Sequence, residues 1–240
     1  MKLPTSPATP AADGRDALAQ ATATCQRVNT LTAEVAVSGS IGGDKIRGRM
    51  LAGVARPSSA RIEAPAPFGA PLFIFVARGD EATLLLPRDD RVLQHGKPEA
   101  VLEAVAGVPL DPAALRAALT GCAQAADAGE ARALGDDWRV LRDGPTQIYL
   151  RRDPHAAPWR VVATVHPEWR AEYRDYLNDL PRTIRLTGAS DTRFDLHLAL
   201  SQVDINTELG ADAFTVQIPR SAQPIALDEL RHARPGVRKN

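Results

Sequence analysis

The sequence predicts a mainly β fold: an antiparallel, strongly curved sheet, or incomplete β-barrel, covered by a small lid of short helices. Most segments from residue 29 to residue 206 alternate apolar and charged positions and end in Gly, Pro or Asp turns, which is typical of strands joined by hairpins. Parallel strands need long helical crossovers, and the sequence shows none, so we expect an antiparallel sheet of about ten strands. Two short helical segments in the middle of the chain would form the lid.

The first half of the chain is expected to supply one helix and most of one apolar face. Apolar residues recur at steps of three and four over residues 14–28, which predicts an amphipathic helix. The glycines of IGGD, residues 41–44, predict a hairpin turn between two alternating strands. Residues 72–77 lack alternation, which predicts a strand covered on both faces. The residues expected to line the sheet side are Val35, Val37, Met50, Ile62, Phe73, Phe75, Leu84 and Leu86.

Two short helices are expected after these strands. Pro98 begins the first and Gly107 ends it, and Asp111 with Pro112 gives the second an N-cap followed by proline at its first position. Helices this short are not stable alone in water, so their apolar side chains must be buried against another element. The residues expected on the lid side are Val101, Leu102, Val105, Leu115 and Leu119.

Composition fits one globular domain. The chain has 240 residues, 44% hydrophobic and 24% charged, and a single core can reach this size. We expect a flexible tether at residues 1–13, one domain over residues 14–232 and a frayed basic tail at residues 233–240. With 29 basic and 29 acidic residues the formal net charge is zero, so no net field favours a nucleic-acid partner.

Motifs for catalysis are lacking, which favours binding over chemistry. The five histidines and two cysteines fit no zinc spacing, and G-x-S-x-G, P-loop and dinucleotide-binding motifs are absent. We therefore expect no enzyme activity, no metal and no cofactor. Carboxylates such as Glu34, Glu63 and Asp195 fall on polar strand faces, where solvated charge is the usual explanation.

Cys25 and Cys122 are the two cysteines of the chain. In an oxidising compartment a disulfide between them would close a loop of about 100 residues and stabilise the fold by roughly 4 to 5 kcal/mol. The alternative is a pair of small buried thiols, because free cysteine is commonly buried.

The segment PAPFGAP, residues 65–71, predicts a loop that carries Phe68 at its tip. An apolar side chain in this position can enter a bilayer and gain roughly 2 kcal/mol from burial. Folding back into the core is the alternative for Phe68, and the residue pattern favours neither.

From about Leu31 to Cys122, the order of these features resembles the LolB family of outer-membrane lipoprotein receptors, within the LolA/LolB superfamily of lipoprotein carriers. The segments that carry the resemblance are the P-F-G around Phe68, the GVPL at residues 107–110 and the LRAALTG at residues 115–121. Weaker similarity continues through PRTIRLTG and LALSQVDIN. The ending FTVQIPRSAQPIALDEL resembles the LolA carriers more than the receptors.

The resemblance implies an incomplete barrel whose cavity takes up the acyl chains of lipoproteins and delivers them to the inner leaflet of the outer membrane. It implies that Phe68 faces that membrane, and similarity to the carriers makes Arg56, directly before Pro57, the latch of the lid. The expected partner is a soluble LolA-like carrier, and the protein is expected to be a monomer. Its expected place is the periplasmic face of the outer membrane, through an N-terminal lipid anchor missing from this sequence.

Two other functions stay open. One is a carrier of another lipid, such as a glycolipid or a polycyclic lipid. The other is a structural outer-membrane lipoprotein with a filled barrel, since the residues assigned to the cavity are equally typical of a plain hydrophobic core.

Overall fold

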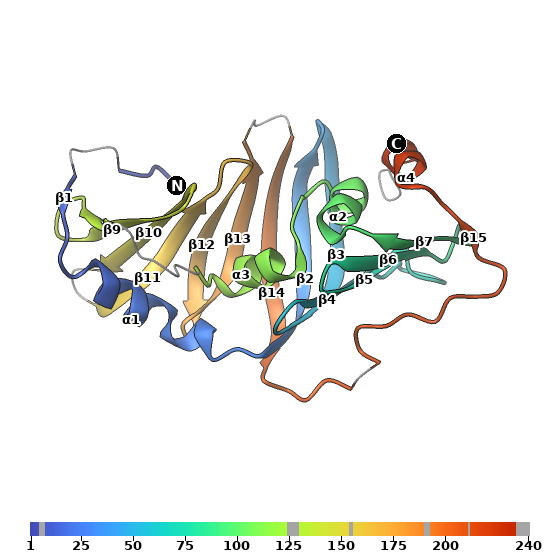
Figure 1. The fold of residues 1–240 in the computed structure, drawn as a ribbon, viewed down its shortest axis with the longest axis horizontal. Coiled ribbons are helices and arrows are strands. Elements are labelled where there is room, and N and C mark those ends of the chain that lie inside the picture. Colours follow the sequence, from blue (N-terminus) through green and yellow to red (C-terminus); the bar gives the residue numbers. More distant parts are fainter. Residues whose placement is uncertain (5–7, 124–129, 154–155, 190–192, 211, 234–240) are drawn as a thin grey trace. The chain divides into compact units, whose positions relative to one another are not determined.

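A computed structural model describes residues 1–4, 8–123, 130–153, 156–189, 193–210 and 212–233 (Figure 1). The chain divides into two compact units, each built from two separate stretches of sequence. Unit 1 comprises Met1–Arg27 and Ala117–Asp191, and unit 2 comprises Val28–Arg116 and Thr192–Asn240.

Unit 1 is a layer of antiparallel strands in the order β1-β8-β9-β10-β11-β12-β13, with the helix α1 packed against β9, β10 and β11. Its elements are α1 (Gly14–Gln26), β1 (Thr9–Pro10), β8 (Arg132–Ala133), β9 (Trp138–Asp143), β10 (Thr146–Asp153), β11 (Ala156–Val165), β12 (Trp169–Leu177) and β13 (Leu180–Gly188). Within the predicted tether, Thr9 and Pro10 pair with β8.

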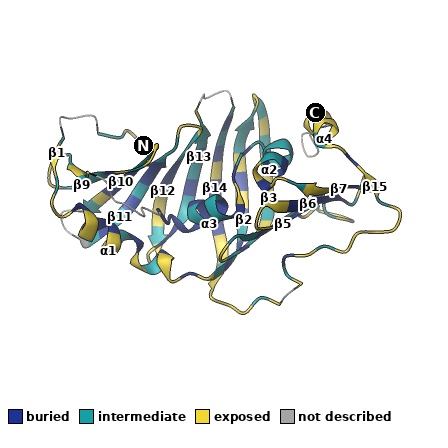
Figure 2. Cartoon of the chain, in the orientation of Figure 1, coloured by how far each residue is buried: buried dark blue, intermediate teal, exposed yellow. Residues whose placement is uncertain are grey.

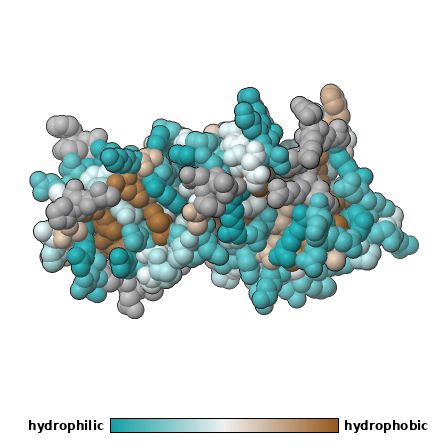
Figure 3. All heavy atoms as spheres, turned by 90° about the horizontal axis from the view of Figure 1, so that it is seen from above, coloured by the Kyte–Doolittle hydropathy of each residue, from teal (hydrophilic) through white to brown (hydrophobic). Residues whose placement is uncertain are grey.

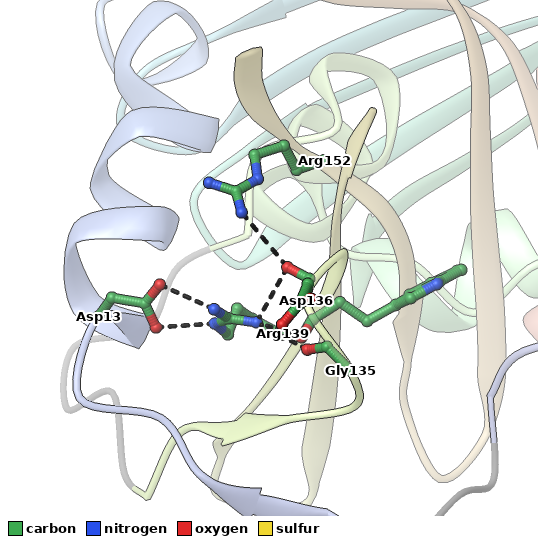
Figure 4. A network of polar contacts seen from close by, with 6 residues as sticks. Asp13, Gly135, Asp136, Arg139 and Arg152 are labelled. Carbon is green, nitrogen blue, oxygen red and sulfur yellow. Dashed lines mark hydrogen bonds and ion pairs between the residues drawn. The ribbon is translucent and has the colours of Figure 1, made fainter. Parts of the chain in front are cut away.

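An arginine network fastens the start of α1 to the strands of unit 1 (Figure 4). The Arg139 guanidinium donates two hydrogen bonds to the Asp13 carboxylate, at 2.7 and 2.9 Å, and further ones to the carbonyls of Gly135, Asp136 and Trp138. It also lies over the Trp159 ring, 4.8 Å from the centroid. Arg139 thus connects the helix, the β8–β9 turn and the core of the unit.

Unit 2 is a second strand layer, in the order β14-β2-β3-β4-β5-β6-β7-β15. Its elements are β2 (Thr30–Ile41), β3 (Asp44–Ala55), β4 (Ser59–Ala64), β5 (Phe73–Arg78), β6 (Glu81–Leu86), β7 (Arg91–Gly96), α2 (Pro98–Ala106), β14 (Phe194–Ile205), β15 (Gln223–Pro224) and α4 (Leu227–Ala233). The helix α2 contacts β6 and α4.

A long segment whose only regular element among the described residues is β15, the C-terminal strap (residues 206–226 without residue 211), runs from β14 to α4 within unit 2 (Figure 1). It begins beside β2, where the Asn206 amide donates to the Thr30 carbonyl at 2.9 Å. Midway, the Arg61 guanidinium of β4 donates to the Thr215 carbonyl at 2.9 Å. It ends as β15, which pairs with β7 in parallel. The strap is therefore fixed to the layer at three places.

The helix α3 (Pro112–Thr120) belongs to unit 2 up to Arg116 and to unit 1 from Ala117. It begins as predicted, because the Asp111 carboxylate accepts a hydrogen bond from the Ala114 amide at 2.7 Å. The predicted end of α2 is also confirmed: Gly107 has a φ of 74° and its amide donates to the Glu103 carbonyl.

The predicted fold class is confirmed. The protein is mainly β, the curved strand layers stay open, and the helices are short. Every strand pairing that the structure describes is antiparallel except that of β15 with β7. Buried and exposed positions alternate along the strands, as the sequence predicted (Figure 2). The described residues form fifteen strands where about ten were expected, and three of these strands have only two residues. Of the predicted basic tail, residues 234–240 lie outside the described residues.

Candidate functional site

The register of unit 2 places the predicted sheet-side residues on one face, here called the inner face. Val35 pairs with Met50, and Ile62 pairs with Phe75, which in turn pairs with Leu84. Side chains of directly paired residues point to the same side of a sheet. Val37, Phe73 and Leu86 share this face because each lies two residues from a member of the set.

Eleven of the thirteen predicted lining residues are buried, with less than 9% of their surface exposed. Met50 and Val105 are half-buried. Val101 and Leu102 lie on α2, and Leu115 on the part of α3 that belongs to unit 2. Leu119 belongs to unit 1, so the structure does not group it with the other twelve.

The helix α2 is held close to the inner face at its C-terminal end. A Cβ atom on Gly107 would lie 2.5 Å from Cγ2 of Ile41, so only a glycine lets the helix end approach β2 this closely. Arg193, just before β14, forms an ion pair with Glu103 of α2. These contacts position α2 as one cover of the apolar layer in unit 2.

Arg56, the predicted latch, is the residue that directly follows β3. Its Nε donates to the Val28 carbonyl at 3.2 Å. Its charge also reaches Arg116 of α3, whose pKa is lowered first by burial and then by repulsion from Arg56. The structure thus places Arg56 near the first half of α3, and its role as a latch stays a prediction.

Phe68 is 88% exposed, so the alternative in which it folds back into the core is wrong. Arg88 fixes the backbone of this loop, because its guanidinium donates to the Phe68 carbonyl at 2.7 Å and to the Ala70 carbonyl at 3.0 Å. Gly69 adopts a φ of 78°, a conformation that glycine enters without strain. The loop therefore presents its phenyl ring to the surroundings from a fixed backbone.

Cys25 and Cys122 form a disulfide, with their Cα atoms 5.5 Å apart. Cys25 lies near the end of α1 and Cys122 in the turn after α3, where its amide donates to the Ala117 carbonyl. The bond therefore ties α1 to the end of α3 within unit 1.

Sequence reasoning left out the apolar residues of unit 1. The strands β9 to β13 bury a row of apolar side chains of their own. Some apolar surface of this unit is also visible in the view from above (Figure 3). The same alternation that was used in the first half could have found it. The buried members include Leu141, Ile148, Leu150, Val161, Ile184 and Leu186.

A cavity of about 370 Å³ lies in unit 2, and none of the thirteen predicted lining residues takes part in it. It is on the opposite, outer face of β2, β3 and β4, between the strands and the C-terminal strap. Glu34 and Glu63, which the sequence suggested were simply solvated, line it. The strap could not be placed from the sequence because it has no periodic pattern. The lining residues are Thr32, Ala33, Glu34, Leu51, Ala52, Gly53, Arg61, Glu63, Gln202, Asp204, Leu209, Ala213 and Phe214.

The described residues hold neither a metal cluster nor a membrane-spanning helix. Among the described residues, no group of His, Cys, Asp and Glu side chains is arranged to hold a metal ion. In the same part of the chain, no helix has the length and hydropathy needed to cross a bilayer.

The fold is similar to that of three solved structures. A LolA superfamily protein from Nitrosomonas europaea aligns with a TM-score of 0.61 at 12% identity, over 85% of this chain and 97% of that one. A Vibrio parahaemolyticus domain assigned to outer membrane lipoprotein sorting aligns with a TM-score of 0.54 at 13% identity, over 84% and 97%. A DUF1329 family protein from Desulfovibrio piger aligns with a TM-score of 0.56 at 10% identity, over 84% and 96%. Comparisons with protein-family models and with curated proteins gave no match.

Proposed function

We propose that this protein is a non-enzymatic carrier that shelters the acyl chains of lipoproteins in the bacterial envelope. The observation that carries the proposal is the inner face of unit 2, where one register collects large apolar side chains beneath the short helix α2. The shared fold with a LolA superfamily protein and with a domain assigned to lipoprotein sorting supports it.

The energetics of an acyl chain explain why shelter alone is a sufficient activity. Burial of a methylene group is worth about 0.8 kcal/mol, so a chain of roughly 16 carbons is unfavourable in water by about 12 kcal/mol. Because the inner-face residues are largely buried, the helical cover must move aside to admit the chain. We propose that Arg56, beside Arg116 of α3, takes part in this movement.

The finer form of the proposal is a LolB-like receptor on the periplasmic face of the outer membrane, lipid-anchored, monomeric and supplied by a soluble LolA-like carrier. Phe68 supports a delivery step, because a large apolar side chain at 88% exposure on a firmly held loop is suited to enter a lipid leaflet. A carrier of another lipid would use the same inner face, and native mass spectrometry of the purified protein would show which lipid it retains.

Two adjacent residues test the acyl site. Met50 lies on the inner face and Leu51 on the outer face of the same strand. Met50→Lys is expected to weaken uptake of a fluorescent fatty acid at least tenfold, because it places a charge against the acyl chain, whereas Leu51→Lys leaves uptake unchanged. Equal effects of both variants, or no uptake by the wild type, would favour a structural protein with a filled interior.

Phe68→Glu tests delivery separately. Transfer of a loaded lipoprotein to liposomes is expected to fall several-fold, while fatty-acid uptake stays at the wild-type level. Leu177→Glu is the matched control, since Leu177 is 56% exposed and lies in unit 1. Unchanged transfer by Phe68→Glu would remove the membrane role of this loop.

A further inference from the structure

The cavity on the outer face of unit 2 is separate from the inner face used in the proposed function. Its lining belongs to β2, β3, β4, β14 and the C-terminal strap. At about 370 Å³ it falls within the size range of small-molecule sites. Adjacent residues of β3 point to opposite faces of the layer: Leu51 lines this cavity, and Met50 lies on the inner face.

Part of the cavity wall is apolar. Leu51 is 45% exposed although it lies within a strand of the layer, and Leu209, Ala213 and Phe214 approach from the strap. Phe214 itself is 8% exposed, so the strap is seated rather than loose at this point. A ligand with a short aliphatic body would cover Leu51 and gain about 25 cal/mol for each Å² of apolar surface removed from water.

The charged residues of the cavity carry more negative than positive charge. Three carboxylates, those of Glu34, Glu63 and Asp204, line it together with one guanidinium, that of Arg61. Arg61 is engaged by the protein itself: it pairs with Glu63 at 3.2 Å and donates to the Thr215 carbonyl at 2.9 Å.

Among the described residues, the ion-pair partner of Glu34 is a distant one. Arg49 lies 3.8 Å away, and its side chain is 79% exposed, so solvent screens the pair. The rim of the cavity therefore offers carboxylate acceptors to a cation, beside the apolar surface of Leu51.

We propose that this outer cavity is a binding site for a small aliphatic amine. The alkyl part of the ligand lies on Leu51, Leu209 and Phe214, and its ammonium group is held by the carboxylates of Glu34 and Asp204. Arg61 keeps the strap in place over the bound ligand through the Thr215 carbonyl.

The test is a titration of the isotope-labelled full chain with n-hexylamine, followed by NMR, with hexanoate as the probe of equal length and opposite charge. Hexylamine is expected to shift amide signals of residues 32–34, 51–53, 202–210 and 212–214, and hexanoate is expected to bind at least tenfold more weakly. Equal binding of both probes, or shifts centred on α2 and the inner face, would overturn the proposal.

Variants sharpen the result. The double substitution Glu34→Gln and Asp204→Asn is expected to weaken hexylamine binding at least tenfold, whereas Glu99→Gln, on α2 and outside the cavity, leaves it unchanged. Met50→Lys separates this site from the acyl site, since it is expected to weaken fatty-acid uptake at least tenfold and to leave hexylamine binding unchanged. Full hexylamine affinity in the double variant would refute the role of the carboxylates, and thermal melts confirm that each variant is folded.

Discussion

Asp13 stands at the N-cap of α1, yet its carboxylate makes no capping hydrogen bond to the helix. The carboxylate instead forms a bidentate ion pair with Arg139, whose side chain is only 11% exposed. Pairs with this geometry are stronger than ordinary surface ion pairs. The hydrogen bonds from Arg139 outweigh the effect of burial and lower the pKa of Asp13.

Asp13→Asn is expected to lower the free energy of unfolding by about 1 kcal/mol at neutral pH, because the charge-assisted hydrogen bonds to Arg139 are lost. A lowered folded-state pKa means that this stabilisation is complete above the unfolded-state pKa, about 4, and is lost as the pH falls below it. Urea unfolding at pH 7 and pH 3 measures the difference from wild type, which should shrink at pH 3. Glu168→Gln, an exposed turn residue of unit 1, is the control, and a difference that persists at pH 3 would contradict the assignment.

Tyr173 makes stability depend on pH in the alkaline range, where Asp13 has no effect. Burial raises its pKa to about 12, although a hydrogen bond with Thr164 acts in the other direction, and burial also raises the pKa of Tyr176. Above pH 10 the unfolded chain therefore releases protons that the folded chain keeps, and stability is expected to fall as the pH rises. Thermal melts between pH 9 and pH 11.5 measure this, and Tyr173→Phe should flatten the decline. A decline of equal slope in Tyr173→Phe would show that other groups cause it.

At the scale of the elements, the sequence was most informative where a periodic pattern met a clear stop signal. Alternation placed the strands around Val35 and Ile62 and the face they share, and the Asp111-Pro112 pair gave the start of α3. The outer cavity was missed because its cover comes from the C-terminal strap, more than 140 residues from Arg61 in sequence. Contacts of that kind depend on tertiary structure and leave no local period.

The Arg61 contact makes the strap testable as an element. Arg61→Gln is expected to lower the free energy that holds the strap to the layer by about 1 kcal/mol, because the charge-assisted bond to the Thr215 carbonyl is lost. Amide exchange of residues 213–218 should then become roughly five-fold faster. Hydrogen-exchange mass spectrometry measures the effect. Arg49→Gln is the matched control, because Arg49 is 79% exposed on the neighbouring strand. Equal exchange in the two variants would mean that the strap is held by other contacts.

At the scale of the whole molecule, each unit combines two stretches of the chain, and in unit 1 a covalent bond joins them. The disulfide closes a separation of 97 residues. The sequence favoured the pair because only two cysteines were present, and it left two buried thiols as the alternative. The sequence gives no sign of the division into two units, because neither a shift in composition nor a linker marks the boundaries.

The double substitution Cys25→Ala and Cys122→Ala is expected to lower the free energy of unfolding by roughly 4 to 5 kcal/mol, the chain-entropy value for such a loop. Hydrogen exchange should quicken mainly in α1 and β9 to β11, which pack together in unit 1. Calorimetry and exchange mass spectrometry measure the two effects, with dithiothreitol treatment of the wild type as the matching comparison. Faster exchange confined to β2–β6 would contradict this assignment.

The short strand β15 has a consequence for how the protein behaves at high concentration. An outermost strand such as β7 would display free amide and carbonyl groups, which are a template for joining sheets of separate molecules. Here Gln223 and Pro224 pair with Arg91 and Val92 at the start of β7, and Pro224 has no amide hydrogen to offer a further strand. The C-terminal segment thus shields the start of β7 from pairing with a strand of another molecule.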